Sequence, residues 1–368
     1  MRTVRSKPAA LLAIMALAKC APSPSLPASV PPAPHPTAAA PPTSAAPTPS
    51  STTASQLPAT AGSSATPAMV KRTKGQSPFA GIRLYVNDYG QAAQQARSWA
   101  KTRPDDAKLI AKIGDQPSGW WMGEWSGDIE TAVHALGNAT SSAGTVPVIV
   151  AYNVPNRDCG QYSAGGSVSA EAYHAWIRQF AKGANGYRLI VVLEPDALGL
   201  MTKCLSPADQ KARLEMIHDA VNVLEATPGT AVYIDAGNAN WTPPKEMAKR
   251  LLGAGVADAD GFALNVSNYI ATDKTIAYGH AIAAAIGAKH FIVDTGRNGN
   301  GATGDSQWCN PDGRALGSPP TTETGDPLID AFFWVKPPGE SDGTCNGGPK
   351  AGQFWPEMAL GLSKRAKW

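Results

Sequence analysis

The sequence has little net charge of either sign. Its 32 Lys and Arg residues and 29 Asp and Glu residues leave a formal net charge of +3 over 368 residues. The basic residues are scattered along the chain rather than gathered in runs. A protein that binds nucleic acid usually presents a concentrated basic surface to the phosphates. We therefore expect no nucleic-acid partner.

The common signatures of metal and cofactor sites are also missing. The six histidines show no metal-ligand spacing, and no serine lies in a nucleophile elbow. Gly299, Gly301 and Gly304 match the glycine spacing of a dinucleotide fingerprint, but the sequence DSQWCNPDG that follows is typical of a loop rather than a helix. The sequence predicts neither a metal ion nor a cofactor.

The N-terminal apolar run is too short to span a bilayer. It extends over residues 9–18 after three basic residues, which is typical of an export signal in residues 1–20. Cys20, in the string LAKC, resembles the lipid-attachment site of bacterial lipoproteins, although Lys19 occupies a position where a small residue is expected. Cleavage after Ala18 without lipidation is the alternative. We expect a secreted protein without a membrane span, either free or lipid-anchored through Cys20.

Residues 21–77 contain neither cysteine nor an aromatic residue and consist mostly of Pro, Ala, Ser and Thr. Such a segment cannot bury enough apolar surface to fold, so we predict a disordered linker. The remaining residues, 78–368, are enough for one large α/β domain.

Apolar runs alternate with helical patterns throughout residues 78–368. The predicted strands are 82–86, 119–123, 146–152, 188–194, 231–236, 261–265, 290–294 and 332–335. Helices are predicted over 172–184, with Ser169 as a cap, and after Ser206-Pro207. Regular alternation of this kind favours a parallel sheet with helices outside it, most economically a closed or nearly closed barrel. A doubly wound open sheet is the alternative.

Polar residues follow the C-terminal ends of the predicted strands, which is where the active sites of such barrels lie. They are Tyr152, Asn153, Asp158, Glu194, Asp196, Asp235, Asn238, Asn265, Asn268, Asp294, Arg297, Lys336, Glu340 and Asp342. Four tryptophans are interleaved with them: Trp120, Trp241, Trp308 and Trp334. Carboxylates beside indole rings suit a site that stacks on sugars and moves protons at a glycosidic oxygen.

The run LIVVLEPDALGL, residues 189–200, ends a buried strand in two carboxylates separated by a proline. Pro195 has no N–H and favours an extended conformation at Glu194, which would place Asp196 at the rim of the barrel. Because Glu194 shares strand alternation with Ile190 and Val192, we predict a buried hydrogen-bonding role for it.

Six motifs, in order, resemble those of glycoside hydrolase family 6, the inverting cellulases that comprise endoglucanases and cellobiohydrolases. They are YNVPNRDCG, VVLEPDALGL, YIDAGNANW, DTGRNGNG, WCNPDGRALG and DAFFWVKPPGESDG. The resemblance implies a distorted, incompletely closed parallel β/α barrel of seven to eight strands, with an open cleft at the strand C-terminal face. It implies a monomer that binds a β-1,4-glucan such as cellulose. Because the loops after Asp158 and Asp294 are short, an endoglucanase is favoured over a cellobiohydrolase.

The resemblance also implies roles for individual residues. Asp196 would be the general acid, Asp158 would raise its pKa and help to activate water, and Tyr152 would distort the sugar. Asp342 matches the carboxylate often proposed as the base. The residues that would bind substrate are Trp120, Asp235, Trp241, Asn268, Trp308, Lys336 and Glu340.

Two positions depart from the family pattern. Ala164, with Ser163 beside it, occupies the place of a serine that positions the catalytic water. Asn238 replaces a histidine. A catalytically weak glucan-binding protein is therefore a further alternative.

Several of these residues also have a purely structural interpretation. Asp235 could pair with Arg297 or Lys336 instead of binding sugar, and Asp294 is expected to pair with Arg297. Trp334 is expected in the core because it lies in an apolar run.

Four cysteines lie in the predicted domain, and an exported protein is expected to pair them as two disulfides, for which three connectivities exist. We predict Cys159 with Cys204 and Cys309 with Cys345. These pairs would tie together the loops that carry Asp158, Asp196 and Asp342.

Overall fold

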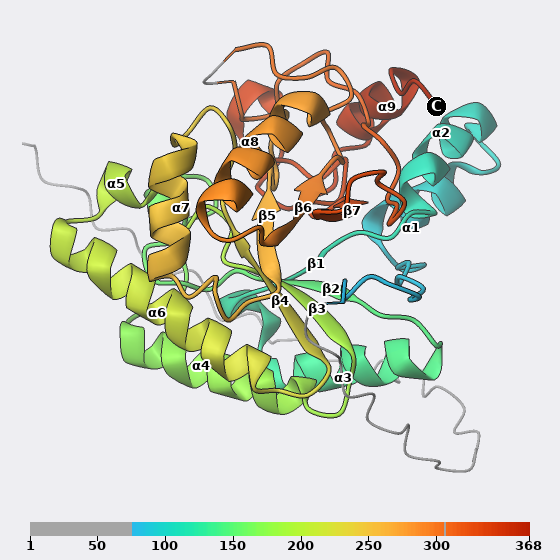
Figure 1. Cartoon of the computed structure of the whole chain (residues 1–368). Coiled ribbons are helices and arrows are strands. Elements are labelled where there is room, and N and C mark those ends of the chain that lie inside the picture. The colour runs from blue at the N-terminus through green and yellow to red at the C-terminus, as the bar shows by residue number, and fades with distance from the viewer. Residues whose placement is uncertain (1–75, 305–306) are drawn as a thin grey trace, which may run out of the picture. The chain divides into compact units, whose positions relative to one another are not determined.

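The computed structural model describes residues 76–304 and 307–368 (Figure 1). The predicted export signal, Cys20 and the predicted linker up to residue 75 lie outside the described residues. Within the described part of the chain, no helix combines the length and the apolar character needed to cross a membrane.

Seven parallel strands form one sheet in which sequence order and spatial order are the same. The strands are β1 (Trp120–Met122), β2 (Val148–Ala151), β3 (Leu189–Leu193), β4 (Thr230–Asp235), β5 (Gly261–Leu264), β6 (His290–Asp294) and β7 (Ile329–Phe333). Every residue of β2, β3, β4 and β5 is buried, as expected for parallel strands covered on both faces. Seven of the eight predicted strands are therefore confirmed.

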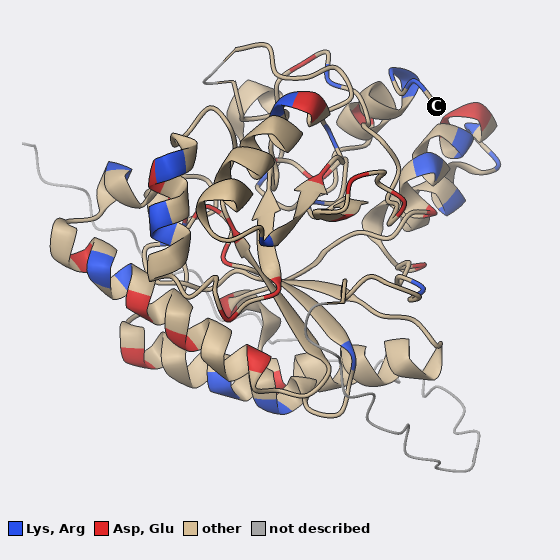
Figure 2. Ribbon diagram, in the orientation of Figure 1, with Lys and Arg blue, Asp and Glu red and all other residues tan. Residues whose placement is uncertain are grey.

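The helices are α1 (Gln91–Trp99), α2 (Pro104–Gly114), α3 (Ile129–Ser142), α4 (Ala170–Ala184), α5 (Met201–Cys204), α6 (Pro207–Glu225), α7 (Pro244–Gly253), α8 (Thr272–Ala285) and α9 (Pro356–Lys364), with short 3₁₀ turns η1 (Glu124–Ser126), η2 (Asp158–Gly160) and η3 (Cys345–Gly347). Helices α3 to α8 lie between successive strands in the sequence, whereas α1 and α2 precede β1 and α9 follows β7. Figure 1 shows α3, α4 and α6 packed side by side. Acidic and basic residues are interspersed along α4 and α6 (Figure 2).

The predicted cap at Ser169 and the predicted helix start at Ser206-Pro207 are confirmed. The Ser169 hydroxyl accepts from the Ala172 N–H at 3.2 Å, and the Ser206 hydroxyl accepts from the Asp209 N–H at 3.2 Å. Pro207 opens α6, where its missing N–H leaves no intrahelical hydrogen bond unmade.

The sheet curls into an incomplete barrel. Between β1 and β7 the contact is a single bridge, Ser118 to Trp334, with the Gly119 N–H donating to the Trp334 carbonyl at 3.0 Å. A Cβ at Gly119 would lie 2.2 Å from the Val335 carbonyl oxygen, so only glycine permits this approach. The prediction of a distorted, incompletely closed barrel is confirmed.

The predicted strand at 82–86 is wrong. The segment makes one isolated bridge, Leu84 to Val146, with backbone hydrogen bonds on either side of it. Its apolar residues are only partly buried. Because this apolar segment pairs with its neighbour at one residue only, it does not form a β-strand.

Strand alternation divides the core into two layers. Val150 and Val192 belong to a cluster enclosed by the curled sheet, whereas Val191 and Leu193 pack against the helices outside it. Trp334 is fully buried and its indole N–H donates to the Ser318 carbonyl at 2.9 Å, which confirms a core role.

Candidate active site

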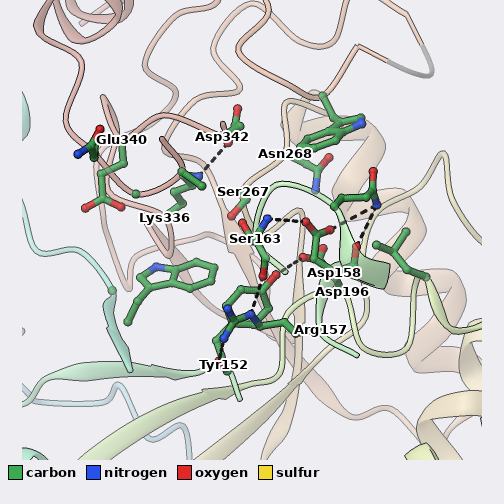
Figure 3. Close-up of a pocket in the computed structure, with 18 of the residues that line it drawn as sticks. Tyr152, Arg157, Asp158, Ser163, Asp196, Ser267, Asn268, Lys336, Glu340 and Asp342 are labelled. Carbon is green, nitrogen blue, oxygen red and sulfur yellow. Dashed lines mark hydrogen bonds and ion pairs between the residues drawn. The ribbon is translucent and has the colours of Figure 1, made fainter. Parts of the chain in front are cut away.

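A pocket of about 600 Å³ lies at the C-terminal ends of the strands (Figure 3). Ten of the predicted site residues line it: Trp120, Tyr152, Asp158, Asp196, Trp241, Asn268, Trp308, Lys336, Glu340 and Asp342. Trp120 lies in β1 and the others follow strands, spread over more than two hundred positions of the sequence. The parallel topology brings them together because every strand ends at the same edge.

Asp196 is held from two sides. The Tyr152 hydroxyl donates to its Oδ2 at 3.0 Å, and its own backbone N–H donates to Oδ2 of Asp235 at 3.0 Å. Burial, followed by the negative charge of Asp158, raises the pKa of Asp196 to about 7. At mildly acidic pH this carboxyl group therefore carries a proton that it can donate.

The backbone before Asp196 differs from the extended conformation predicted for Glu194. Glu194 and Asp196 have φ values of 51° and 71°, in the left-handed region that non-glycine residues seldom occupy. The Glu194 carboxylate accepts hydrogen bonds of 3.0 Å from the backbone N–H groups of Asn153 and Val154. These bonds offset the strain and confirm the buried hydrogen-bonding role predicted for Glu194. A strained turn, rather than an extended segment, presents Asp196 to the pocket.

Asp235 lies beneath Asp196 rather than in the pocket wall. It is 1% exposed, and its Oδ2 accepts from the N–H groups of Asp196 and Gly237 at 3.0 Å each. Burial, followed by the charge of Asp196, raises its pKa well above the usual range. The suggested pairing with Arg297 or Lys336 is wrong, and the geometry gives Asp235 the task of positioning the Asp196 backbone.

The Asp158 loop is ordered by its own hydrogen bonds. The Ser163 N–H donates to Asp158 Oδ2 at 2.9 Å, and burial raises the pKa of Asp158. Arg157 pairs with Glu124 and donates to the Tyr152 carbonyl at 2.9 Å, so it ties this loop to the end of β2.

The structure also bears on the departure at Ala164. Ser163 lines the pocket, whereas the Ala164 carbonyl accepts from Arg157 at 3.0 Å. Counting along the sequence pointed to Ala164, but the neighbouring Ser163 is the residue that lines the pocket. A serine is therefore present at the site although the matched position is alanine.

Asp342 is enclosed by donors. Arg297 donates from Nη1 to Oδ2 at 3.0 Å and its Nη2 lies 3.0 Å from Oδ1, while Lys336 Nζ lies 2.9 Å from Oδ1. The Tyr269 hydroxyl and the Asn310 N–H donate to Oδ2 at 2.9 and 3.0 Å. Burial alone would raise the pKa of Asp342, but Arg297 and Lys336 outweigh it and hold the pKa well below the usual range. This carboxylate stays ionised.

The ion pair predicted between Asp294 and Arg297 is wrong, because Arg297 reaches Asp342 instead. Asp294 accepts from three backbone N–H groups, those of Ser267, Gly296 and Lys336, at 2.9 to 3.1 Å. It therefore fixes the loops on which Lys336 and Ser267 stand.

Strand alternation separates the two tryptophans of β1. Trp121 packs with the cluster inside the curled sheet, and its ring meets Tyr152 edge-on at 5.1 Å. Trp120 packs with the helix-side cluster and against Tyr85 at 6.3 Å, although it also lines the pocket. The sequence motifs pointed to Trp120 and did not single out Trp121, which also lines the pocket. The signal was available, because a side chain beside Tyr152 must share the inward face of its strand.

Both predicted disulfides are present, Cys159 with Cys204 and Cys309 with Cys345.

The departure at Asn238 has a local structural role. Asn238 is buried, and its side-chain oxygen accepts a hydrogen bond from the Asn240 N–H at 3.0 Å. Where the family commonly has histidine, this residue stabilises a turn.

The family model for glycosyl hydrolases family 6 matches residues 79–366. Endoglucanase A of Thermobispora bispora is 42% identical over 315 residues, which cover 83% of this chain and 65% of that protein. The chain thus spans somewhat less than two thirds of that relative. Endoglucanase 1 of Streptomyces halstedii is 44% identical over 283 residues, which cover 74% of this chain and 86% of that protein.

A solved structure shares the fold. The endoglucanase Cel6 from Mycobacterium tuberculosis, in complex with methyl-cellobiosyl-4-deoxy-4-thio-β-D-cellobioside, superposes with a TM-score of 0.74 at 40% sequence identity. The match covers 78% of this chain and 98% of that structure.

Proposed function

Because the chain belongs to the glycosyl hydrolases of family 6, we propose that it is a secreted endo-β-1,4-glucanase. It hydrolyses internal bonds of cellulose or a related β-1,4-glucan and inverts the anomeric centre. The observation that carries the proposal is a carboxyl group, Asp196, with a pKa of about 7 in a pocket lined by tryptophans. The apolar segment after the N-terminal basic residues and the two disulfides support export.

Asp196 is the general acid in this proposal. Its raised pKa keeps it protonated at mildly acidic pH, so it can protonate the leaving glycosidic oxygen. Tyr152 donates to it and stands beside it in the pocket, where the phenol also presses on the sugar and favours its distortion.

Asp158, rather than Asp342, is the better proton acceptor for the attacking water. A base with a very low pKa accepts a proton poorly, and Asp342 already accepts hydrogen bonds from Arg297, Lys336, Tyr269 and Asn310. Asp158 has a raised pKa, and its loop places Ser163 in the pocket. We assign the water relay to Asp158 with Ser163, and to Asp342 the orientation of Lys336 and Arg297.

The pocket walls supply the sugar contacts. Trp241 and Trp308 offer apolar faces on which pyranose rings stack, while Lys336, Glu340 and Asn268 offer partners for hydroxyl groups. Trp121 joins this set because its ring adjoins Tyr152.

The names of the two bacterial relatives support internal cleavage, as do the short loops after Asp158 and Asp294. One alternative is a cellobiohydrolase, and the other is a glucan-binding protein with weak catalysis. The presence of Ser163 in the pocket counts against the weakly catalytic glucan-binding protein.

The test is to follow viscosity and reducing ends together on carboxymethyl cellulose, with xylan as the comparison substrate. An endoglucanase lowers the viscosity early, before much sugar is released, and acts more slowly on xylan. Cellobiose release at nearly constant viscosity would establish a cellobiohydrolase. No release of reducing ends from soluble cellulose would overturn the proposed activity.

A further inference from the structure

Gln91, the first residue of α1, reaches across to the loop after β7. Its side-chain nitrogen donates to Glu340 Oε1 at 3.2 Å and to the Gly352 carbonyl at 3.2 Å. Its side-chain oxygen accepts from the Phe354 N–H at 3.0 Å. A backbone N–H can only donate, so the amide oxygen must face Phe354 and the NH₂ group must face Glu340. Three contacts therefore fix the orientation of one exposed carboxamide.

Glu340 stands where two cavities meet. It lines the main pocket and also a side cavity of about 200 Å³, whose wall includes Tyr89, Gln91, Pro338 and Phe354. A carboxylate at this junction could turn toward either space. Within residues 76–304 and 307–368, Gln91 supplies the only hydrogen bond to the Glu340 carboxylate. The direction in which Glu340 points thus depends on Gln91.

We propose that Gln91 is a positioning residue for Glu340. By binding Oε1 it holds the carboxylate at the main pocket and leaves Oε2 to accept a hydrogen bond from a glucosyl hydroxyl. The inference rests on the proposed function, since it concerns how that pocket binds a β-1,4-glucan.

The protonation of Glu340 also depends on Gln91. Burial raises the pKa of Glu340 to about 7, and the charge of Asp342 adds to the rise. The charges of Lys336 and Arg297 and the Gln91 hydrogen bond oppose it. Removing the Gln91 amide would raise the pKa further. A protonated Glu340 has lost acceptor capacity, so sugar binding would weaken most near neutral pH and recover as the pH rises.

Two substitutions distinguish a role of Gln91 in positioning Glu340 from a purely structural role in holding the loop after β7. Gln91→Leu removes all three contacts. Gln91→Glu is nearly isosteric and keeps an acceptor for the Phe354 N–H, but it places a negative charge against Glu340. Gln94→Leu is the matched control, because Gln94 lies on the same helix and, among the residues that the structure describes, its side chain binds only the nearby Tyr89 carbonyl.

The measurements are KM and kcat on carboxymethyl cellulose, the melting temperature, and the Kd of cellotetraose by calorimetry from pH 5.5 to 9. We expect KM to rise about tenfold in both Gln91 variants, the change produced by losing a hydrogen bond to a charged group, with kcat within about twofold of wild type. In both Gln91 variants, tight binding of cellotetraose should begin at a higher pH than in the wild-type protein. Gln94→Leu should match wild type in every measurement.

Unchanged KM and Kd profiles in Gln91→Glu would overturn the inference, as would a lower melting temperature in Gln91→Leu with no change in KM. If Gln91→Leu does not fold, Gln91→Glu still decides. If wild-type protein does not cleave soluble cellulose, the proposed function fails first. If it does and the Gln91 variants bind normally, only the positioning role fails.

Discussion

The Tyr152 hydroxyl donates a hydrogen bond of 3.0 Å to Oδ2 of Asp196. Burial is the largest cause of the raised pKa of Asp196 and the Asp158 charge adds to it, whereas the Tyr152 hydrogen bond lowers it. Two neighbours thus act on the acid in opposite directions.

Because Tyr152 and Asp158 act on the pKa of Asp196 in opposite directions, replacing each should shift the pH dependence of kcat in opposite directions. Tyr152→Phe removes a donor to the ionised form, so the pKa of Asp196 rises and the alkaline limb of kcat moves to higher pH. Asp158→Asn removes a negative charge, so the limb moves to lower pH. Both variants should also lose rate. Shifts in the same direction, measured on a soluble cello-oligosaccharide, would contradict the electrostatic account.

Asp196→Asn should lower turnover on cellulose by roughly 10²–10⁴-fold, the usual contribution of general acid catalysis. The loss should be smaller on aryl cellosides with good leaving groups, which need little protonation. Binding of cellotetraose, measured by calorimetry, serves as the control for an intact pocket. A near wild-type rate on cellulose would remove Asp196 from the role.

Ser163→Ala should reduce kcat by up to about 10²-fold, the cost of a misplaced reactant, because it removes the hydroxyl of a pocket-lining residue whose backbone N–H binds Asp158. Ala164→Ser is the matched control and should change kcat little, since that residue's carbonyl is engaged by Arg157. A larger effect at position 164 than at 163 would reverse the assignment.

Thermal stability should fall as the pH rises from 5 to 8. The pKa values of Glu194, Asp196 and Glu340 are raised to about 7 and that of Asp294 to about 6, above the values of about 4 in an unfolded chain. Over this window the native state binds more protons than the unfolded state, so the free energy of unfolding decreases with pH. Asp342, with its lowered pKa, is ionised in both states throughout and leaves the sign unchanged. Differential scanning calorimetry at pH 5 and pH 8 checks the prediction, and a higher melting temperature at pH 8 would refute it.

Replacing Cys159 and Cys204 together by serine should lower the free energy of unfolding by about 2–5 kcal/mol. The pair joins η2, which carries Asp158, to α5 beyond Asp196. Because the loop loses its tether, kcat should fall along with stability. Urea unfolding and turnover of the double variant check both effects, and full activity at reduced stability would show that the bond serves the fold alone.

The parts of the fold that the sequence predicted are those decided by local pattern. β3 reads as a strand because Leu189 to Leu193 are uniformly apolar, and α6 begins at Pro207 because Ser206 caps it. The segment 82–86 carries a similar apolar pattern but lacks a long enough partner. Strand formation depends on such partners, which one segment cannot show.

In the site, residue types were predictable but partners were not. Asp342 was expected in the pocket, yet its enclosure by Arg297 and Tyr269 comes from loops far apart in the sequence. The left-handed backbone of Glu194 depends on amides from the loop after β2, and these outweigh the extended preference imposed by Pro195. Counting residues along the Asp158 loop could not show that Ser163, rather than Ala164, lines the pocket.

The most direct test of the account is the configuration of the first product. An inverting site leaves room for water between its carboxyl groups, whereas a retaining site forms a covalent glycosyl intermediate. Proton NMR of cellohexaose hydrolysis, recorded within minutes and before mutarotation, should show the α-anomer accumulating first at the newly formed reducing ends. Initial accumulation of the β-anomer would contradict direct attack by water and, with it, the assignment of Asp196 as the acid of an inverting glucanase.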